Sequence, residues 1–355
     1  MNTFCMAPFS RMTGGPEGTY RTCCYHPPIE KRYTNVLDAF EGGEMQILRQ
    51  RMLDGEHIKE CESCYYYESI GELSQRQVIN QEHTYIKEYH LEGLEISFNN
   101  KCNFACVTCK PESSSIWEDR VGKIDKITPD YSGVDFSKLK HLSFTGGEPT
   151  IQREFSPKFF AMLDEQVKYD TLFFSMNTNC SKFVHRPWVE FINKLKRVMI
   201  MTSIDGIGAV GEWVRLGLKM DIWEKNALRW KDLLKDNKEY TYGDMTSGVW
   251  SNFVMTNYNV FNVDETEKYL ASLGIRMRKT NCFSPEYLSP EYLPDEIKKE
   301  LPANDFVQNI LNANEYNEKH CKEFMVYTKY LETFAPAPEE AKFVYRKLEE
   351  YYVAN

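Results

Sequence analysis

The sequence predicts an α/β protein built on a parallel sheet of six strands, a partial (β/α)6 version of the TIM barrel. From about residue 90, short runs rich in β-branched and aromatic residues alternate with longer amphipathic stretches. Such alternation is typical of strands and helices that follow one another in a parallel sheet. Residues 1–75 differ, because they are rich in cysteine and in loop-forming residues.

Six apolar runs are predicted to be strands, and each is followed by turn-forming or polar residues. They are residues 94–98, 141–145, 172–178, 197–204, 249–256 and 275–280. Helices are predicted over 156–168, which opens with Ser-Pro, over 185–196, where apolar residues recur every three or four positions, and over 262–274, which opens with Asn and closes with Gly. In a barrel of this kind the active site is expected at the C-terminal ends of the strands.

Three domains are expected. Residues 1–75 form a small cysteine-rich module with one clear helix near 44–54, and residues 90–290 form the barrel. Residues 291–355 form a helical C-terminal extension, interrupted by the sequence FAPAPEE. Its amphipathic pattern indicates helices that pack on the edge of the barrel.

Charge and composition exclude several classes of protein. The chain has 355 residues, and 43 Lys and Arg against 52 Asp and Glu give a net charge of −9, so nucleic acid is not an expected partner. The sequence contains no apolar run long enough to cross a membrane and no secretory signal at its start, so a cytoplasmic protein without membrane contact is expected. Eight of the eleven cysteines fall in the first third, which in this context favours metal or redox chemistry over disulfides.

Three cysteines lie directly after the first predicted strand. Cys102, Cys106 and Cys109 have the spacing C-x3-C-x2-C and occupy the first strand-to-helix loop. Zinc sites and iron–sulfur clusters are usually closed by four protein ligands, so a group of three leaves one position open for a substrate or cofactor. A zinc knuckle is the alternative interpretation of the spacing alone.

This spacing resembles the signature of the radical S-adenosylmethionine (radical SAM) superfamily. The resemblance implies a [4Fe–4S] cluster on the three cysteines, with the amino and carboxylate groups of S-adenosylmethionine (SAM) on the fourth iron. It further implies reductive cleavage of SAM to a 5′-deoxyadenosyl radical, which abstracts hydrogen from a substrate. In such enzymes the cofactor supplies the chemistry and the protein positions it.

Further motifs at the strand ends resemble the SAM-binding residues of this superfamily. The GGEP motif, Gly146, Gly147, Glu148 and Pro149, ends the second strand and is implied to hold the methionine amino group. The other implied contacts are Asn177 or Asn179, Ser203 and Asp205 at the ribose, Arg215 at the methionine carboxylate, and Asn257. The alternatives are ordinary turn and capping residues and, for Arg215, a surface arginine.

One position departs from the family pattern. Many members carry an aromatic residue just before the third cysteine, where it packs on the adenine, and this chain has Thr108 there. Adenine packing is therefore expected from elsewhere or from the backbone of Thr108 alone.

The N-terminal cysteines resemble the opening of the SPASM and twitch modules of radical SAM enzymes. Cys5 is followed by a twelve-residue spacer, Gly18, four residues and Cys23, and then by the pair Cys61 and Cys64. The resemblance implies one auxiliary [4Fe–4S] cluster on these four cysteines, although the usual modules follow the barrel. Cys24 could replace Cys23, and a structural zinc site with four cysteines is the main alternative.

Three residues that follow the cysteine pair and two cysteines of the barrel are also assigned roles from the sequence. Glu68, Glu72 and Arg76 are predicted to lie on a helix that packs the module against the barrel. Cys180 and Cys282 follow the third and sixth strands and are candidates for returning a hydrogen atom to the substrate radical, as a cysteine does in some peptide epimerases of the superfamily. The alternative is that both are buried as small apolar residues.

The resemblance implies a radical SAM oxidoreductase or modifying enzyme. The expected substrate is a peptide or protein that undergoes oxidation, cross-linking or epimerisation, and the expected electron donor is a flavodoxin or ferredoxin. A sugar or nucleotide-derived small molecule is the alternative substrate. Two further hypotheses are non-radical chemistry on SAM, such as methyl transfer, and a zinc- or cluster-binding interaction protein without catalysis.

Overall fold

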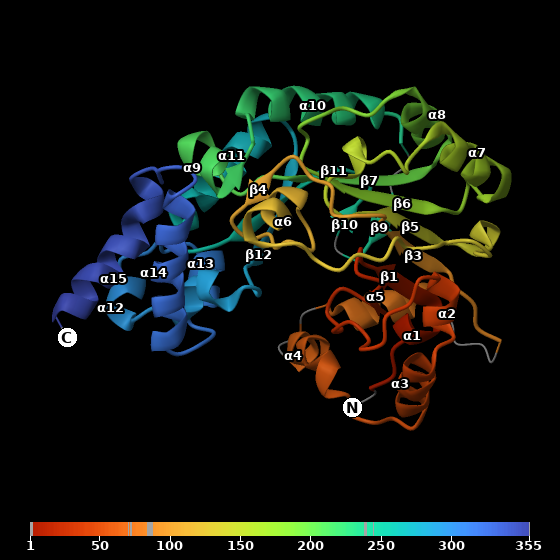
Figure 1. Cartoon of the computed structure of the whole chain (residues 1–355), viewed down its shortest axis with the longest axis horizontal. Coiled ribbons are helices and arrows are strands. Elements are labelled where there is room, and N and C mark those ends of the chain that lie inside the picture. The colour runs from red at the N-terminus through yellow and green to blue at the C-terminus, as the bar shows by residue number, and fades with distance from the viewer. Residues whose placement is uncertain are drawn as a thin grey trace.

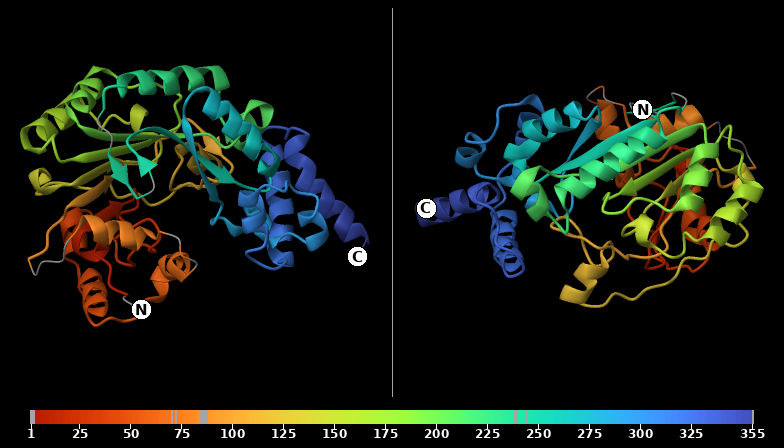
Figure 2. Two further views of the ribbon diagram at one scale, coloured as in Figure 1. Left: turned by 180° about the vertical axis from the view of Figure 1, so that it is seen from behind. Right: turned by 90° about the horizontal axis from the view of Figure 1, so that it is seen from above.

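An open sheet of eight strands organises the chain. The computed structural model describes residues 3–69, 71, 73–83, 88–237, 240–243 and 245–354. In order across the sheet the strands are β12 (Arg276–Asn281), β11 (Gly248–Met255), β7 (Arg197–Ser203), β6 (Phe173–Thr178), β5 (His141–Phe144), β3 (Gly93–Ile96), β1 (Arg11–Gly14) and β2 (Tyr20–Arg21). Figures 1 and 2 show a curved sheet with helices along its outer side and the N-terminal segment on the other side.

The six predicted strands are confirmed as β3, β5, β6, β7, β11 and β12. Each pairs in parallel with the next, in chain order. Their residues alternate between the two faces of the sheet, as any strand requires. On β7, for example, Val198 and Ile200 are fully buried beneath the outer helices, whereas Ser203 is half-buried on the inner face.

Helices cover the outer face of the sheet between successive strands. Three predicted helices lie there as α7 (Pro157–Gln166), α8 (Arg186–Lys194) and α11 (Val263–Ser272), while the fourth is α3 (Gly43–Leu53) in the N-terminal segment. The helix α7 begins as expected, because the Ser156 side chain accepts a hydrogen bond from the backbone N–H of Phe159 and Pro157 occupies the first turn. The outer layer also contains α9 (Gly208–Val214) and the long α10 (Met220–Leu233), and a hairpin of β9 (Thr241–Tyr242) and β10 (Met245–Thr246) precedes β11.

The N-terminal segment contributes directly to the sheet, which the sequence did not predict. Strand β1 pairs in parallel with β3, and β2 pairs antiparallel with β1. Around these strands lie α1 (Ala7–Ser10), α2 (Val36–Phe40), α3, α4 (Glu62–Ser69) and α5 (Gln75–Glu82). The single helix expected through Glu68 and Arg76 is wrong, because the two residues lie on α4 and α5 and are joined by a buried ion pair. Glu72 lies outside the described residues.

An aromatic cluster fills the space between the outer face of the sheet and the helices. The ring of Phe144 on β5 lies 4.5 Å from that of Phe155, 4.9 Å from that of Phe174 and 5.5 Å from that of Trp188, centroid to centroid. All four side chains are essentially inaccessible to solvent. Aromatic rings at these distances stabilise the core beyond the burial of their area.

The inner face of the sheet carries polar residues at several positions. Thr13 on β1, Glu95 on β3, Ser143 on β5 and Ser175 on β6 are half-buried and line one cavity, together with apolar residues such as Phe173. The interior of a closed TIM barrel is filled with packed apolar side chains. This open sheet therefore leaves a cavity with polar groups where a closed barrel has its core.

The C-terminal helices pack beside β11 and β12, away from the N-terminal segment (Figure 1). They are α12 (Asp295–Lys298), α13 (Asp305–Leu311), α14 (Glu318–Glu332) and α15 (Phe343–Ala354). The Tyr327 hydroxyl donates to the carbonyl of Val107 over 2.9 Å, and Trp213 Nε1 donates to the carbonyl of Ala335 over 3.0 Å. These helices therefore support the cysteine loop. Among the described helices, none has the length and apolar character needed to cross a lipid bilayer.

Truncation of Phe144 tests the importance of the aromatic cluster. We expect Phe144→Ala to lower the free energy of unfolding by about 3–5 kcal/mol, because the substitution leaves a cavity among rings that cannot close around it. The shift in thermal midpoint measures this loss. Phe283→Ala is the matched control, since that side chain is 59% exposed. An equal shift in the two variants would contradict this account of the core.

Candidate functional site

The loop that carries Cys102, Cys106 and Cys109 is held from two sides. Residues Ala105–Cys106 form the short strand β4, which pairs antiparallel with β8 (Arg215–Leu216). On the other side lies α6 (Ser115–Val121), where Ser115 Oγ accepts from the backbone N–H of Cys102 and Trp117 Nε1 donates to the carbonyl of Cys106. The loop is thus fixed at the C-terminal end of β3, where the sequence places it.

Hydrogen-bond donors are directed at two of the three sulfur atoms. Arg215 Nη1 lies 3.7 Å from Cys106 Sγ, and Asn179 Nδ2 lies 3.8 Å from Cys102 Sγ. A hydrogen bond from Cys109, together with the Arg215 cation, lowers the pKa of Cys106 despite its burial. Burial raises the pKa of Cys102 to about 12. N–H groups directed at cysteine sulfurs are typical of iron–sulfur sites, whose potential they tune.

A buried ion pair joins the sheet to the cysteine loop. Arg215 Nε lies 2.8 Å from Asp205 Oδ2, with the side chains 11% and 0% exposed, so the interpretation of Arg215 as a surface arginine is wrong. The two atoms form an ion pair without the alignment of a hydrogen bond. The other oxygen of Asp205 accepts from the backbone N–H of Val254 over 2.8 Å. Burial alone would lower the pKa of Arg215, but Asp205 and the neighbouring cysteines raise it above its ordinary value.

The glycines of the GGEP motif allow two loops to pack backbone against backbone. A Cβ atom on Gly147 would lie 2.3 Å from the carbonyl oxygen of Lys101, and Gly146 has a φ of +99°. The backbone N–H of Glu148 donates to the same Lys101 carbonyl over 2.8 Å. Only glycine fits this close approach. The motif therefore fixes the entry to the cysteine loop.

The carboxylate of Glu148 is occupied by neighbouring protein donors. Glu148 is 1% exposed and accepts from Thr178 Oγ1 over 2.8 Å, from the backbone N–H of Asn179 over 2.6 Å, and from both the hydroxyl and the N–H of Thr150. Burial raises its pKa, while these hydrogen bonds lower it. In this structure Glu148 ties the loop after β5 to the loop after β6. Pro149, also buried, opens the short turn that follows.

Other residues expected to contact SAM lie at the strand ends or in the cysteine loop. Asn177 is exposed, and Ser203 and Thr108 are half-buried. Asn257 is buried and donates from Nδ2 to the carbonyl of Tyr287, while its Oδ1 has no hydrogen-bond partner among the described residues. A buried amide oxygen without a partner is costly, so this atom is available to a ligand. Asn179 instead uses its amide on Asn103 and Cys102.

Cys180 and Cys282 both lie in apolar surroundings. Cys180 is fully buried with a φ of +56°, and its carbonyl accepts from Asn226 Nδ2. Cys282 is 2% exposed, and its Sγ lies 3.8 Å from the carbonyl of Pro285. Burial raises the pKa of Cys282 to about 12 and that of Cys180 well above its ordinary value. These surroundings match the alternative of buried small residues.

The N-terminal cysteines gather in one place. Cys5, Cys23, Cys61 and Cys64 line one small cavity between α1, α4 and α5. Burial raises the pKa of Cys5, and the other three thiols raise it further. Cys24 points elsewhere and lines the inner-face cavity of the sheet. The structure thus groups Cys23, and not Cys24, with the other three.

The spacing of the thiols bears on the group that they could hold. One zinc ion with Zn–S bonds of about 2.3 Å requires sulfur atoms roughly 3.8 Å apart. Within the described residues, no three cysteine sulfurs all lie within 4.8 Å of one another. The backbone N–H of Ala7 lies 3.4 Å from Cys5 Sγ, the kind of contact that iron–sulfur sites use. In the described part of the chain, the cysteines are therefore not set at the spacing of a bound zinc ion.

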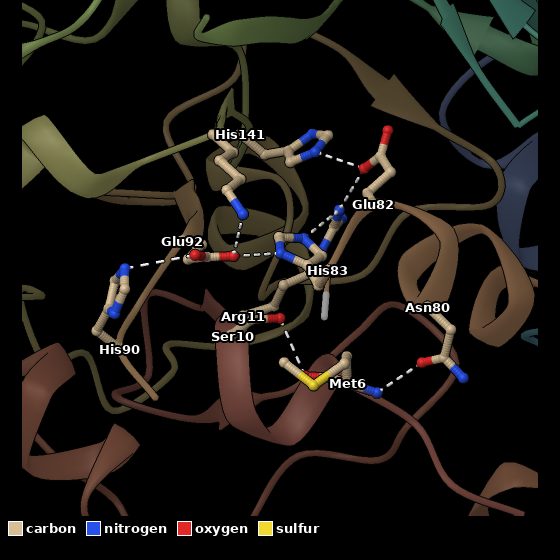
Figure 3. Close-up of polar contacts among 10 residues, drawn as sticks. Met6, Ser10, Arg11, Asn80, Glu82, His83, His90, Glu92 and His141 are labelled. Carbon is tan, nitrogen blue, oxygen red and sulfur yellow. Dashed lines mark hydrogen bonds and ion pairs between the residues drawn. The ribbon is translucent and has the colours of Figure 1, made fainter. Parts of the chain in front are cut away.

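A second polar cluster closes the inner-face cavity at the opposite end of the strands (Figure 3). The ligand-type atoms of Glu82, His83 and His141 lie within 4.8 Å of one another, a donor set that suits divalent metals. However, Arg11 Nη2 lies 3.2 Å from Glu82 Oε2 and 3.5 Å from His83 Nε2, so a guanidinium already supplies positive charge there. His141 Nε2 lies 2.5 Å from the same Glu82 oxygen, and His83 Nδ1 contacts Glu92. We therefore interpret this cluster as a structural link between α5, β1 and β5.

Sequence reasoning missed several residues that hold the site. Ser114 caps α6 and donates from Oγ to the carbonyl of Phe104, and a Ser-Ser pair before an apolar run is a recognisable helix-start signal. Asn103 accepts from Asn179 and Ser181. Tyr327 contacts the cysteine loop from 220 residues away, for which the sequence offers no local signal.

Comparisons with known proteins give only distant structural likenesses. No family model matches the chain. No curated protein matches it either. Among solved structures, anSMEcpe with bound AdoMet is 18% identical at a TM-score of 0.42, and the match covers 70% of this chain and 63% of that one. A histidine-tagged form of the same protein is 21% identical at a TM-score of 0.40, covering 55% and 52%.

A third likeness is to SuiB of Streptococcus suis, solved bound to its precursor peptide SuiA. The two chains are 16% identical at a TM-score of 0.38, and the match covers 93% of this chain and 75% of that one. Against anSMEcpe the chain spans about half to under two thirds of the other protein's length. Likenesses this distant carry no argument about the function of this chain.

The buried pair of Asp205 and Arg215 gives a testable prediction. Arg215→Gln leaves the Asp205 carboxylate without its cation, and we expect a loss of about 3–5 kcal/mol, seen as a lower thermal midpoint. The double variant Asp205→Asn/Arg215→Gln should recover part of the loss, because no buried charge remains unpaired. Additive losses in the double variant would show that the pair is not coupled.

The His141 cluster gives a pH prediction. Burial, assisted by the charge of Arg11, lowers the pKa of His141 to about 4, against about 6.5 in an unfolded chain. Between these values the unfolded state binds more protons, so stability falls as the pH falls, by up to about 1.4 kcal/mol per pH unit. Thermal midpoints from about pH 7 to about pH 5 should fall more steeply in the wild type than in His141→Gln. The exposed His185→Gln variant should keep the wild-type slope, and equal slopes in all three would contradict the assignment.

Proposed function

We propose that this protein is a radical SAM enzyme with one auxiliary iron–sulfur cluster. The observation that carries the proposal is the arrangement at the end of β3. Three cysteines share one loop, N–H donors of Arg215 and Asn179 face two of their sulfurs, and the GGEP backbone packs on the entry to the loop. The loop lies at the C-terminal ends of parallel strands, where barrel enzymes place their chemistry.

Cys102, Cys106 and Cys109 would hold a [4Fe–4S] cluster with SAM on its open iron. Bound there and reduced by one electron, SAM would supply a 5′-deoxyadenosyl radical able to abstract hydrogen. The chain's own part is to bind and orient the cofactor. The Oδ1 atom of Asn257 and the half-buried Ser203 offer polar contacts at the strand ends.

The remaining residues expected to bind SAM divide into two roles. Asn177 and the backbone at Thr108 are accessible and are proposed as direct contacts. Glu148 and Asp205 are proposed as positioning residues, because protein donors already occupy their carboxylates. Arg215 is proposed to act on the cluster through Cys106 and to leave the methionine carboxylate to other groups.

Cys5, Cys23, Cys61 and Cys64 are proposed to hold the auxiliary [4Fe–4S] cluster. Their gathering around one cavity supports this assignment. Burial raises the pKa of Cys5, Cys61 and Cys64, and metal coordination would deprotonate the thiols that it engages.

A peptide or protein is proposed as the substrate, modified by oxidation, cross-linking or epimerisation. The inner-face cavity supports this choice, because Thr13, Ser143 and Ser175 offer donors and acceptors that a peptide backbone can use. A sugar or nucleotide-derived small molecule would use the same groups. A flavodoxin or ferredoxin is the proposed electron donor.

Formation of 5′-deoxyadenosine tests the proposal directly. Anaerobically reconstituted protein with dithionite and SAM should yield 5′-deoxyadenosine and contain about eight irons per chain, which is two cubane clusters. Cys106→Ala should abolish the product and retain about four irons. The matched Cys61→Ala variant should also lose about half of the iron and yet still cleave SAM.

The outcomes separate the competing hypotheses. About four irons together with zinc in the wild type would make the N-terminal site a zinc site. Methylated product without 5′-deoxyadenosine would support non-radical transfer from SAM. Full iron loading with no SAM turnover, even after peptide extracts are added as substrate, would favour a cluster-binding protein without catalysis.

A further inference from the structure

Glu95 places a carboxylate in the middle of the inner face of the sheet. It lies on β3, where Thr13 of β1 and Ser143 of β5 are its partners on either side. Ser175 of β6 continues the same row, and all four residues line the inner-face cavity. Residues paired on neighbouring strands point to the same face of a sheet. The carboxylate is therefore flanked by hydroxyl groups along one row.

The inner-face cavity has room for a ligand beside this carboxylate. Its volume is about 180 Å³, whereas roughly 15 Å³ is enough to hold one water molecule. Toward the N-terminal ends of the strands the cavity is lined by Arg11, His141 and Phe173. Arg11 is already paired there, because its Nη2 lies 3.2 Å from Glu82 Oε2 (Figure 3). The Arg11 cation is thus engaged by another carboxylate.

The Glu95 carboxylate has no close cationic partner in the described chain. Among the residues that the structure describes, no Lys, Arg or His nitrogen lies within 4.0 Å of its oxygens. The hydrogen bond that it does accept comes from Thr145 Oγ1, 3.1 Å from Oε1. Burial raises the pKa of Glu95, while Thr145 and the charge of Arg21 lower it. A half-buried carboxylate with one neutral donor gains most from a ligand that brings positive charge.

The groups around Glu95 favour an ammonium over a guanidinium ion. Thr13 Oγ1 makes no hydrogen bond with the described residues. Ser143 Oγ accepts from Ser175 over 2.8 Å and keeps a second lone pair. An ammonium carries three donors on one nitrogen and can contact a carboxylate together with an adjacent hydroxyl oxygen. The planar fork of a guanidinium instead matches a carboxylate with both oxygens open, and Thr145 already contacts one oxygen of Glu95.

We propose that Glu95 binds a primary ammonium group of the substrate in the inner-face cavity. The inference deepens the proposed function and rests on it in naming the ligand as the substrate. Asn177, a proposed SAM contact, lies two residues after Ser175 on β6, which is roughly 7 Å along a strand. A substrate held by its ammonium at Glu95 would extend its other end toward the C-terminal strand ends, where the proposed radical forms.

Binding of small probes tests the ammonium site without SAM cleavage. Butylammonium, butanol and butyrate share one alkyl chain and differ in charge, and ligand-observed NMR on anaerobic holoprotein gives their dissociation constants. We expect butylammonium to bind roughly tenfold more tightly than butanol, because a charge-assisted hydrogen bond to a carboxylate is stronger than a neutral one. Equal binding of butylammonium and butanol, or tighter binding of butyrate, would overturn the proposal.

The variant Glu95→Gln locates the site. It keeps the shape of the side chain and an acceptor for Thr145 but removes the charge, so we expect butylammonium to bind roughly tenfold more weakly, with little change for butanol. Glu165→Gln is the matched control, because it removes the same charge from an exposed position on α7 and should keep the wild-type values. Iron content and thermal midpoint establish that both variants are folded. Unchanged butylammonium binding in Glu95→Gln, or an equal loss in both variants, would exclude the site.

Two larger probes distinguish the source of the ammonium. The N-acetyl, N-methylamide derivative of lysine carries it on a peptide side chain, and glucosamine carries it on a sugar ring. Tighter binding of the lysine derivative assigns a lysine-containing peptide, and tighter binding of glucosamine assigns an amino sugar. Binding of neither probe, or a preference that persists in Glu95→Gln, would overturn the site. Formation of 5′-deoxyadenosine is measured separately, so failure of the ammonium site and failure of the SAM chemistry are distinguishable.

Discussion

The buried ion pair between Asp205 and Arg215 is the interaction on which the candidate site depends. Asp205 follows β7 and also accepts from the backbone of β11, while Arg215 begins the short strand that pairs with β4. The pair thereby connects the neighbouring strands β7 and β11 to the loop of Cys106. Desolvation makes such pairs poor sources of net stability, but removal of one partner is costly. We infer that its value lies in fixing one position of the cysteine loop.

Polar side chains at the strand ends fall into two groups, according to whether they already form hydrogen bonds with other parts of the protein. Glu148 and Asn179 form hydrogen bonds to neighbouring loops, whereas no side-chain partner is found among the described residues for Asn177, Ser203 or the Oδ1 atom of Asn257. The first group gives the loops a fixed geometry. The second presents groups that a bound cofactor can use without breaking existing contacts. Such division between positioning and contacting residues is what a preorganised site requires.

The sequence predicted the strands and helices whose formation depends on residues close together in the chain. The strands of the parallel sheet and the helices α7, α8 and α11 follow from β-branched runs, apolar periodicity and capping signals. Strand β1 escaped prediction because it has four residues of mixed polarity and pairs with β3 across some eighty positions. Likewise, the motifs identified Asp205 and Arg215, but their pairing with each other depends on tertiary proximity. The choice between Cys23 and Cys24 could not be made from the sequence, since both lie in the bend after β2 and the direction of each thiol depends on tertiary structure.

Extension of the sheet by β1 and β2 explains how a cysteine of the N-terminal group comes to line the inner-face cavity. Because the sheet remains open, threonine, serine and glutamate line this cavity beside apolar residues, where a closed barrel packs apolar side chains. The added strands carry Cys23 and Cys24 to the rim of that face. Cys23 lines both the small cavity of the four N-terminal thiols and the inner-face cavity, so a cluster bound by those thiols would border the inner-face cavity. The strands that extend the sheet thus bring the two cavities together at Cys23.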